Sequence, residues 1–226
     1  PERAAAAAAD IDRAVALRDA ARRVVILAGG GARGCEAVLT ALALRLDAPV
    51  VLTVNARGML HGHALGVPAS PSLDAVRDVI RGADQVLALG TELGPTDYDM
   101  YVRGGLPDLS GMIRVDVCAD QLARHKAALP IRAEVAGVAA ALLGRVAAKS
   151  GDGAERAAAG RVAARAELAG LHPSMPAQLE MVEAIRAAMP GALIVGDSTQ
   201  PVYAGNLFYD HDRPGGWFNA ATGYGA

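Results

Sequence analysis

The sequence has 226 residues, of which 52% are hydrophobic and 4% aromatic, and its formal net charge is −2. Because acidic and basic residues are mixed throughout, this charge disfavours nucleic acid as a partner. No apolar run approaches the roughly 18–20 residues of a membrane span and no secretory signal is visible, so we expect a cytoplasmic protein that does not enter a membrane. Two cysteines, Cys35 and Cys118, are too few for a disulfide framework and agree with a reducing compartment.

The first 150 residues alternate between helical and strand-like patterns. Short apolar, β-branched runs predict buried parallel strands, and the longer stretches between them predict helices, with Ser72 as the expected N-cap of one. This alternation predicts a Rossmann-like α/β fold, in which a parallel sheet carries helices on both faces. The predicted helices span residues 10–23, 35–46, 72–82 and 135–149, and the predicted strands span 24–28, 48–54, 85–90, 112–117 and 130–135.

A change of composition marks the end of this unit. Residues 149–161 are small, polar and charged, which indicates a linker running into a helix. We therefore divide the chain into a central domain (1–150), a linker (151–173) and a second α/β unit (174–226). We expect this second unit to be incomplete, because the sequence stops inside a glycine-rich turn. Its predicted elements are a helix at 175–189 with Pro176 in the first turn, a strand within 192–200, a helix at 201–209 and a loop at 209–217.

The stretch Gly29–Gly34 reads G-x-G-x-x-G between a predicted strand and a predicted helix, which is the context of a dinucleotide-binding loop. That fingerprint also needs an acidic residue about 20 positions later for a ribose hydroxyl. Thr53 and Asn55 stand there instead, which disfavours NAD. Two other interpretations remain: a tight turn that allows close packing, or a different nucleotide held by backbone N–H groups.

Further polar residues follow the other predicted strands. Gly90, Thr91 and Glu92 follow one strand, and Asp116 ends the next. Ligands of open parallel sheets gather at the carboxyl ends of the strands, so an acid there can accept from ribose hydroxyls. Each acid can equally serve as a helix cap or a turn residue. Residues 95–101 are either a solvated loop or the border of such a pocket.

Several segments, taken in chain order, resemble those of a known enzyme family. The segments "VVILAGGGARGCEAVLTALALRLDAPVVLTVNARGMLHGHALG", "ADQVLALGTELG" and "IRVDVCADQL" resemble the central domain of thiamine diphosphate (ThDP) enzymes of the acetolactate synthase and 2-oxo-acid decarboxylase family. The stretch "ALIVGDSTQ" with "GGWFNAATGYGA" is similar to the opening of that family's C-terminal, pyrophosphate-binding domain. The resemblance covers nearly the whole chain.

The resemblance implies two sets of contacts. Ser198, Thr199 and Gln200 match the family's loop against the ThDP diphosphate, and Gly223 and Gly225 match the turn beneath the aminopyrimidine. FAD, which the synthases bind in this domain, is implied less directly, because "TELGPTDYDM" and "LGVPASPS" depart from their pattern. The positions that match FAD or nucleotide contacts are Gly29, Gly30, Gly31, Thr53, Gly90, Glu92 and Asp116.

The resemblance also implies a function for the full-length protein. It implies decarboxylation of a 2-oxo acid followed by acetolactate synthase-like carboligation, with ThDP and Mg²⁺, in a homo-oligomer (dimer or tetramer) whose active sites lie between subunits. One alternative is a ThDP-dependent decarboxylase of a basic or aromatic 2-oxo acid; another is a nucleotide-binding or structural domain without ThDP chemistry. The family's activating Glu and its metal-binding G-D-G…N motif match nothing here, so we expect no catalytic residue or metal ligand in this fragment, and no activity from it alone.

Overall fold

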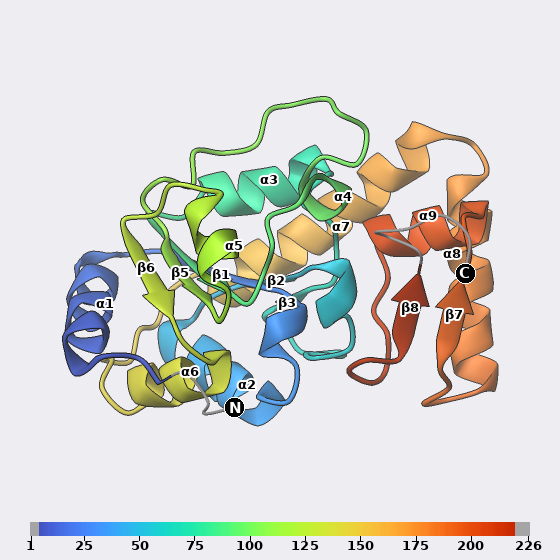
Figure 1. Cartoon of the computed structure of the whole chain (residues 1–226). Coiled ribbons are helices and arrows are strands. Elements are labelled where there is room, and N and C mark those ends of the chain that lie inside the picture. The colour runs from blue at the N-terminus through green and yellow to red at the C-terminus, as the bar shows by residue number, and fades with distance from the viewer. Residues whose placement is uncertain (1–4, 220–226) are drawn as a thin grey trace.

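The first unit is built on one six-stranded sheet. The structure, a computed structural model, describes residues 5–219. The strands lie in the order β3-β2-β1-β4-β5-β6 and every neighbouring pair is parallel (Figure 1). The strands are β1 (Val24–Ala28), β2 (Val50–Leu52), β3 (Gly66–Val67), β4 (Gln85–Leu89), β5 (Ile113–Asp116) and β6 (Leu129–Arg132).

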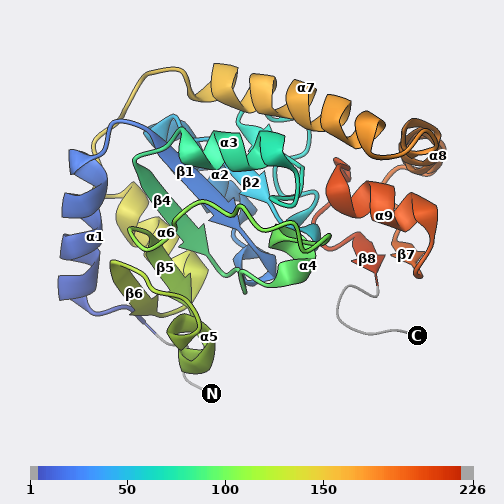
Figure 2. The ribbon, with the colours of Figure 1, turned by 90° about the horizontal axis from the view of Figure 1, so that it is seen from above.

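Helices cover both faces of this sheet. One face carries α1 (Ala8–Ala20), α2 (Glu36–Leu46) and α6 (Val135–Leu143), and the other carries α3 (Asp74–Arg81) and α7 (Gly153–Leu171), as Figure 2 shows from above. The predicted Rossmann-like α/β class is therefore confirmed. Short helical turns follow the strands: η1 (Gly30–Ala32), η2 (Val54–Ala56), α4 (Pro95–Tyr98) and α5 (Ala119–Ala123).

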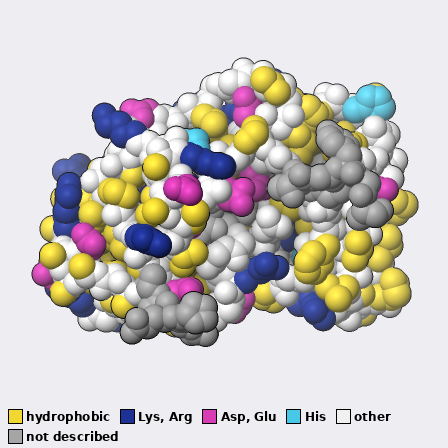
Figure 3. All heavy atoms as spheres, viewed as in Figure 1, with side chains coloured by type: hydrophobic (Ala, Val, Ile, Leu, Met, Phe, Trp, Pro, Cys, Tyr) yellow, Lys and Arg dark blue, Asp and Glu magenta, His cyan; other side chains and the backbone are white. Residues whose placement is uncertain are grey.

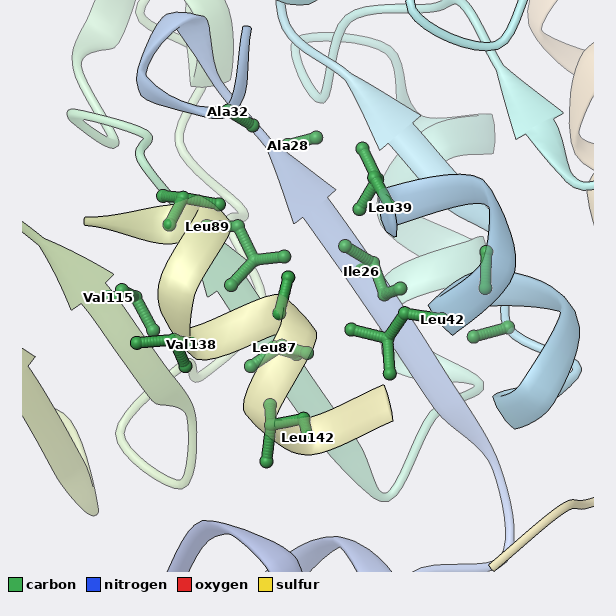
Figure 4. Packing of buried hydrophobic residues seen from close by; sticks show 14 of the residues in the cluster. Ile26, Ala28, Ala32, Leu39, Leu42, Leu87, Leu89, Val115, Val138 and Leu142 are labelled. Carbon is green, nitrogen blue, oxygen red and sulfur yellow. The ribbon is translucent and has the colours of Figure 1, made fainter. Parts of the chain in front are cut away.

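Alternation along the strands divides the core into two apolar clusters. Successive side chains of a strand point to opposite faces, so Ile26 of β1 belongs to one cluster and Leu27 to the other. In the first cluster, Ile26 lies beside Leu39 and Leu42 of α2, while Leu87 of β4 lies nearer to Leu142 of α6 (Figure 4). All five residues of β1 are buried, which is why the strand reads as an unbroken apolar run.

The second unit contains a two-stranded parallel sheet. Its strands β7 (Ile194–Gly196) and β8 (Trp217–Asn219) are joined through α9 (Gln200–Leu207), and α8 (Met175–Ala188) precedes them. Strand β8 begins at Trp217, the last residue of the predicted loop 209–217, and no strand was predicted there. Val195 and Phe218 face each other in register, yet they are 77% and 45% exposed. Hydrophobic side chains gather over this end of the molecule in Figure 3, so one face of this small sheet is uncovered.

The segment predicted as a linker consists mostly of a long helix. Helix α7 lies within residues 151–173 and is bound to the first unit. Its Arg161 donates from Nη1 to the carbonyl oxygens of Ala64 (2.8 Å) and Gly66 (2.7 Å), next to the edge strand β3. At its start, the Gly153 N–H donates to Asp47 Oδ2 over 3.1 Å. The division into domains itself stays a prediction.

The prediction that Ser72 caps a helix is wrong. Helix α3 begins at Asp74 and its N-cap position is Leu73, which makes no capping bond. The carboxylate of Glu167 in α7 caps the helix, because it accepts from the Asp74 N–H (3.0 Å) and the Ala75 N–H (2.9 Å). The Ser72 hydroxyl instead accepts a hydrogen bond from the Met100 N–H over 2.8 Å. A carboxylate that is distant in sequence therefore takes the place of the predicted local cap, and Ser72 joins two loops.

Two leucines of α2 test this account of the core. Leu42 is fully buried and Leu44 is 57% exposed on the same helix. We expect Leu42→Ala to lower the free energy of unfolding by about 2–5 kcal/mol, because it leaves a cavity against the sheet. Leu44→Ala should change it by less than about 0.5 kcal/mol. Urea unfolding followed by circular dichroism measures both, and equal losses would contradict the packing described.

Candidate functional site

A cavity of about 770 Å³ lies at the carboxyl ends of β1, β2 and β4, where the first unit meets the second. The loops after these strands form one wall, and residues of α4 and the segment after it form another. Residues of the second unit close the cavity: Asp197, Ser198, Val202, Tyr203, Asn206 and Asn219. Seven of the predicted site residues line this cavity: Gly29, Gly30, Gly31, Thr53, Gly90, Glu92 and Ser198.

The remaining predicted site residues lie elsewhere. Asp116 ends β5, as predicted, but it is not among the residues that line the cavity. Its Oδ1 accepts from the Cys118 N–H over 2.9 Å, which is the turn role that we considered as an alternative. Thr199 is outside the cavity lining as well, and Gln200 borders a neighbouring hollow of about 570 Å³. Gly223 and Gly225 lie outside the described residues.

The backbone donors of the glycine loop are largely used within the protein. Gly29 N–H donates to Leu89 O over 2.9 Å and Gly31 N–H to Gly90 O over 3.0 Å. The Ala32 and Arg33 N–H groups close the η1 turn onto Gly29 and Gly30. A dinucleotide loop must present such N–H groups to the phosphates. This loop therefore does not fit the diphosphate of FAD, and its bonds are those of the tight turn considered above.

The start of helix α2 is also occupied. The Gly34 N–H donates to Glu36 Oε1 over 2.8 Å, so a carboxylate of the helix itself sits where a phosphate would lie. Glutamate is favourable in a first helical turn because it complements the helix dipole. An anionic ligand would be repelled by it.

Close approach of two loops explains the glycines. A Cβ atom on Gly29 would lie 2.5 Å from Thr91 Cα, and one on Gly31 would lie 2.9 Å from Gly90 Cα. Gly90 itself has a φ of +58°, which favours glycine. The loops after β1 and β4 can therefore touch backbone to backbone only because these positions carry no side chain.

The cavity wall is predominantly acidic. Four carboxylates, those of Glu92, Asp97, Asp99 and Asp197, line it against the single guanidinium of Arg124. Burial raises the pKa of Asp97, an effect that its hydrogen bond from the Val54 N–H opposes and the nearby Glu92 carboxylate reinforces.

The segment 95–101 has two faces. Asp97, Asp99 and Met100 border the cavity, which is one of the two predicted roles. Tyr98 is fully buried and its hydroxyl lies 3.1 Å from Thr91 Oγ1, so the segment is not simply a solvated loop. Burial raises the pKa of Tyr98, which keeps the phenol neutral.

The loop after β7 has the chemistry of an anion site. Residues 197–200 are exposed and lead into α9, which begins at Gln200 and has Pro201 in its first turn. Asp197 accepts from the Ser198 N–H at Oδ1 and from the Thr199 N–H at its carbonyl oxygen, both over 2.7 Å. Within residues 5–219 the Ser198 hydroxyl has no hydrogen-bond partner. The Ser198 and Thr199 N–H groups are thus used within the loop, and the free Ser198 hydroxyl at the start of a helix is the group that fits a diphosphate.

A buried arginine that sequence reasoning missed joins the two units. Arg57 is 1% exposed, and its guanidinium donates to Leu52 O (3.1 Å), Pro68 O, Asn206 O (2.8 Å) and Tyr209 O (2.8 Å). Burial lowers the pKa of Arg57 to about 10, against the carboxylates of Asp97 and Asp210. Its one sequence signal is a charge inside the otherwise uncharged run from Ala48 to Leu60.

Two other properties concern membranes and metals. None of the helices in the described part of the chain combines the length and the apolar run that a bilayer crossing requires. Residues 5–219 also contain no group of three or more His, Cys, Asp or Glu side chains placed to hold a metal ion.

Comparison with known proteins identifies the family. Residues 11–142, more than half of the chain, match the model of the thiamine pyrophosphate enzyme central domain. The chain therefore belongs to the thiamine pyrophosphate (ThDP) enzymes, as its sequence resemblance indicates.

Two curated relatives extend the match. The chain is 36% identical over 211 residues to the probable 2-ketoarginine decarboxylase AruI of Pseudomonas aeruginosa, covering 91% of this chain and 37% of that protein. It is 34% identical over 194 residues to the sulfoacetaldehyde acetyltransferase of Rhodobacter capsulatus, covering 80% of this chain and 33% of that protein. The chain thus spans about a third of the length of these relatives.

A pair of glycine variants tests the account of the loop. Gly29 has a φ of −108°, which any residue adopts, so only space forbids a side chain there. We expect Gly29→Ala to lower the free energy of unfolding by about 1–3 kcal/mol through overpacking. Gly94, with a φ of −75° and no atom within 4 Å of an added Cβ, is the control, and Gly94→Ala should be neutral or slightly stabilising. Urea unfolding that shows no difference between the two would contradict the close approach of the loops.

Proposed function

We propose that the protein containing this chain is a ThDP-dependent enzyme that decarboxylates a basic 2-oxo acid and releases the aldehyde. The observation that carries the proposal is the exposed Asp197–Gln200 loop at the start of α9, in a chain of this family. The basic side chain of the substrate is suggested by the similarity to a relative named as a 2-ketoarginine decarboxylase. This is the decarboxylase alternative of the sequence analysis.

The residues of this chain would act on the diphosphate end of the cofactor. Ser198 offers a hydroxyl group and Gln200 a side-chain amide, and the eight-residue helix α9 directs its positive end toward the same place. The Thr199 hydroxyl donates to Asp197 O over 3.4 Å and would have to turn from it to donate to the diphosphate. When bound, ThDP supplies the electron sink for the carbanion left by departing carbon dioxide. Holding the diphosphate fixes the position of the reactive ring, and it does not require these residues to touch the substrate.

The proposal needs no flavin. The donors of the Gly29–Gly34 loop are largely used internally and the Glu36 carboxylate occupies the start of α2, so we propose that FAD is absent from this protein. We retain Mg²⁺, a homo-oligomer and a cytoplasmic location as proposals that follow from the family resemblance.

A second candidate is carboligation. The chain is also similar to a relative named as an acetyltransferase, which supports transfer of the two-carbon unit to an acceptor instead of its release. The acetolactate synthase-like reaction of the sequence analysis is of this kind. The product distinguishes the candidates: an aldehyde from decarboxylation alone, or an acetohydroxy acid from carboligation.

A substrate panel tests the proposal on the full-length parent. Basic, aromatic and small aliphatic 2-oxo acids are offered with and without ThDP and Mg²⁺, and carbon dioxide and the organic product are measured. We expect ThDP-dependent release of an aldehyde, fastest from the basic substrate. No turnover of any 2-oxo acid by the loaded protein would contradict the proposal, and acetohydroxy acid formation would favour carboligation.

A serine pair tests the diphosphate loop separately. Ser198→Ala should raise the KM for ThDP about tenfold, because it removes one hydrogen bond to a charged group. Ser150, exposed and outside both cavities, provides the control, and Ser150→Ala should leave this KM unchanged. An unchanged KM in Ser198→Ala would remove this residue from the proposed contacts.

A further inference from the structure

Helix α9 is held at the end opposite to the proposed diphosphate loop. Its last turn contributes the carbonyl oxygens of Asn206 and Leu207, which accept from the Arg57 guanidinium and from the Ser70 N–H, both over 2.8 Å. Just beyond the helix, the Tyr209 N–H donates to Pro68 O over 3.0 Å. All the first-unit partners come from the segment 57–70, so one short stretch of the first unit binds the C-terminal end of α9.

Arg57 is the residue of this segment that bonds to both units through its side chain. Its donors reach the first unit at Leu52 and Pro68 and the second unit at Asn206 and Tyr209. A guanidinium can serve carbonyl groups on several sides at once because its five N–H donors form a rigid planar fork, which a lysine ammonium lacks. The side chain is 1% exposed, and its hydrogen bonds go to backbone oxygens instead of a carboxylate.

The free-energy cost of burying the Arg57 charge indicates that the orientation of α9 matters. A buried charge with no ion-pair partner is expensive, and an apolar residue of the same volume often stabilises a fold better. The guanidinium instead holds the C-terminal end of α9 in one position against the first unit. Because α9 is a single rigid helix of eight residues, the placement of its C-terminal end also determines where Ser198 and Gln200 lie.

We propose that Arg57 is a positioning residue for ThDP: by fixing the C-terminal end of α9 on the central domain, it sets the place of the Asp197–Gln200 loop that receives the diphosphate. The inference rests on the proposed function. It assigns the central domain an indirect part in cofactor binding, because Arg57 acts through the end of α9.

Arg77 provides a matched control. It is also 1% exposed and donates to Pro71 O (2.8 Å), Tyr98 O (3.1 Å) and Asp99 Oδ1 (3.0 Å), all within the first unit. Replacing either arginine by methionine should lower the melting temperature, because both changes leave buried carbonyl groups unpaired. A change in cofactor binding is expected from Arg57 alone.

The experiment uses the full-length parent with Mg²⁺. We expect Arg57→Met to raise the Kd and the KM for ThDP about ten- to a hundredfold, as small misplacements of binding groups do, while kcat at saturating ThDP changes much less. Arg57→Lys, which keeps the charge and loses the fork, should lie between wild type and Arg57→Met. Arg77→Met should keep the KM for ThDP within about twofold of wild type. Hydrogen exchange should be faster in α9 of the Arg57 variants and unchanged there in Arg77→Met.

The outcomes separate the two proposals. Wild-type parent that binds no ThDP would overturn the proposed function and this inference together. Wild type that binds ThDP, with equal affinity in a folded Arg57→Met or Arg57→Lys, would overturn the inference alone. Equal losses in the Arg57 and Arg77 variants would show general destabilisation and would also overturn it. If Arg57→Met does not fold, Arg57→Lys decides the question by the same measurements.

Discussion

A parallel sheet that is apolar on both faces must be covered on both, and this constraint organises the molecule. Every residue of β1 and β4 is buried, so helices have to pack above and below them. Helices α1, α2 and α6 cover one face, and α3 and α7 cover the other. With both faces used for packing, polar groups and open space are left to the edges of the sheet. The cavity lies at the carboxyl edge for this reason.

At that edge the backbone itself is crowded. The loops after β1 and β4 touch at Gly29, Gly31 and Gly90, and their N–H groups pair with neighbouring carbonyl oxygens. A G-x-G-x-x-G pattern arises here from close packing, because any side chain at Gly29 or Gly31 would overlap the adjacent loop. The same glycines that would admit a phosphate in a dinucleotide site are used to bring two loops together. The pattern alone cannot distinguish these uses; the destination of each N–H can.

The parts of the fold that follow from local pattern were predictable. Strand β1 is an unbroken apolar run and β4 is apolar after Gln85, and the alternation of such runs with helical patterns was enough for the fold class. Strands β3 and β8 have two and three residues, too few for any periodicity to show. The role of Ser72 depends on Met100, and that of Arg57 depends on carbonyl groups about 150 positions away. Such contacts exist only after the chain has folded, so no local pattern carries them.

The candidate site divides in the same way. Gly29, Thr53, Gly90 and Glu92 were found because strand ends can be read from the sequence, and all of them border one cavity. What binds at that edge could not be predicted from the sequence, because it depends on which N–H groups remain free after folding. In open α/β sheets the carboxyl edge usually receives a ligand. Here part of that edge receives protein: Arg57, Pro68 and Ser70 bind the end of α9 and the residue pair beyond it. This part of the carboxyl edge is therefore used for packing between the two units. The N–H groups of the glycine loop bond to neighbouring carbonyl oxygens, and the donors of Arg57 and Ser70 bond to the end of α9, so the part of the edge that packs against protein is defined by hydrogen bonds that the glycine pattern does not reveal.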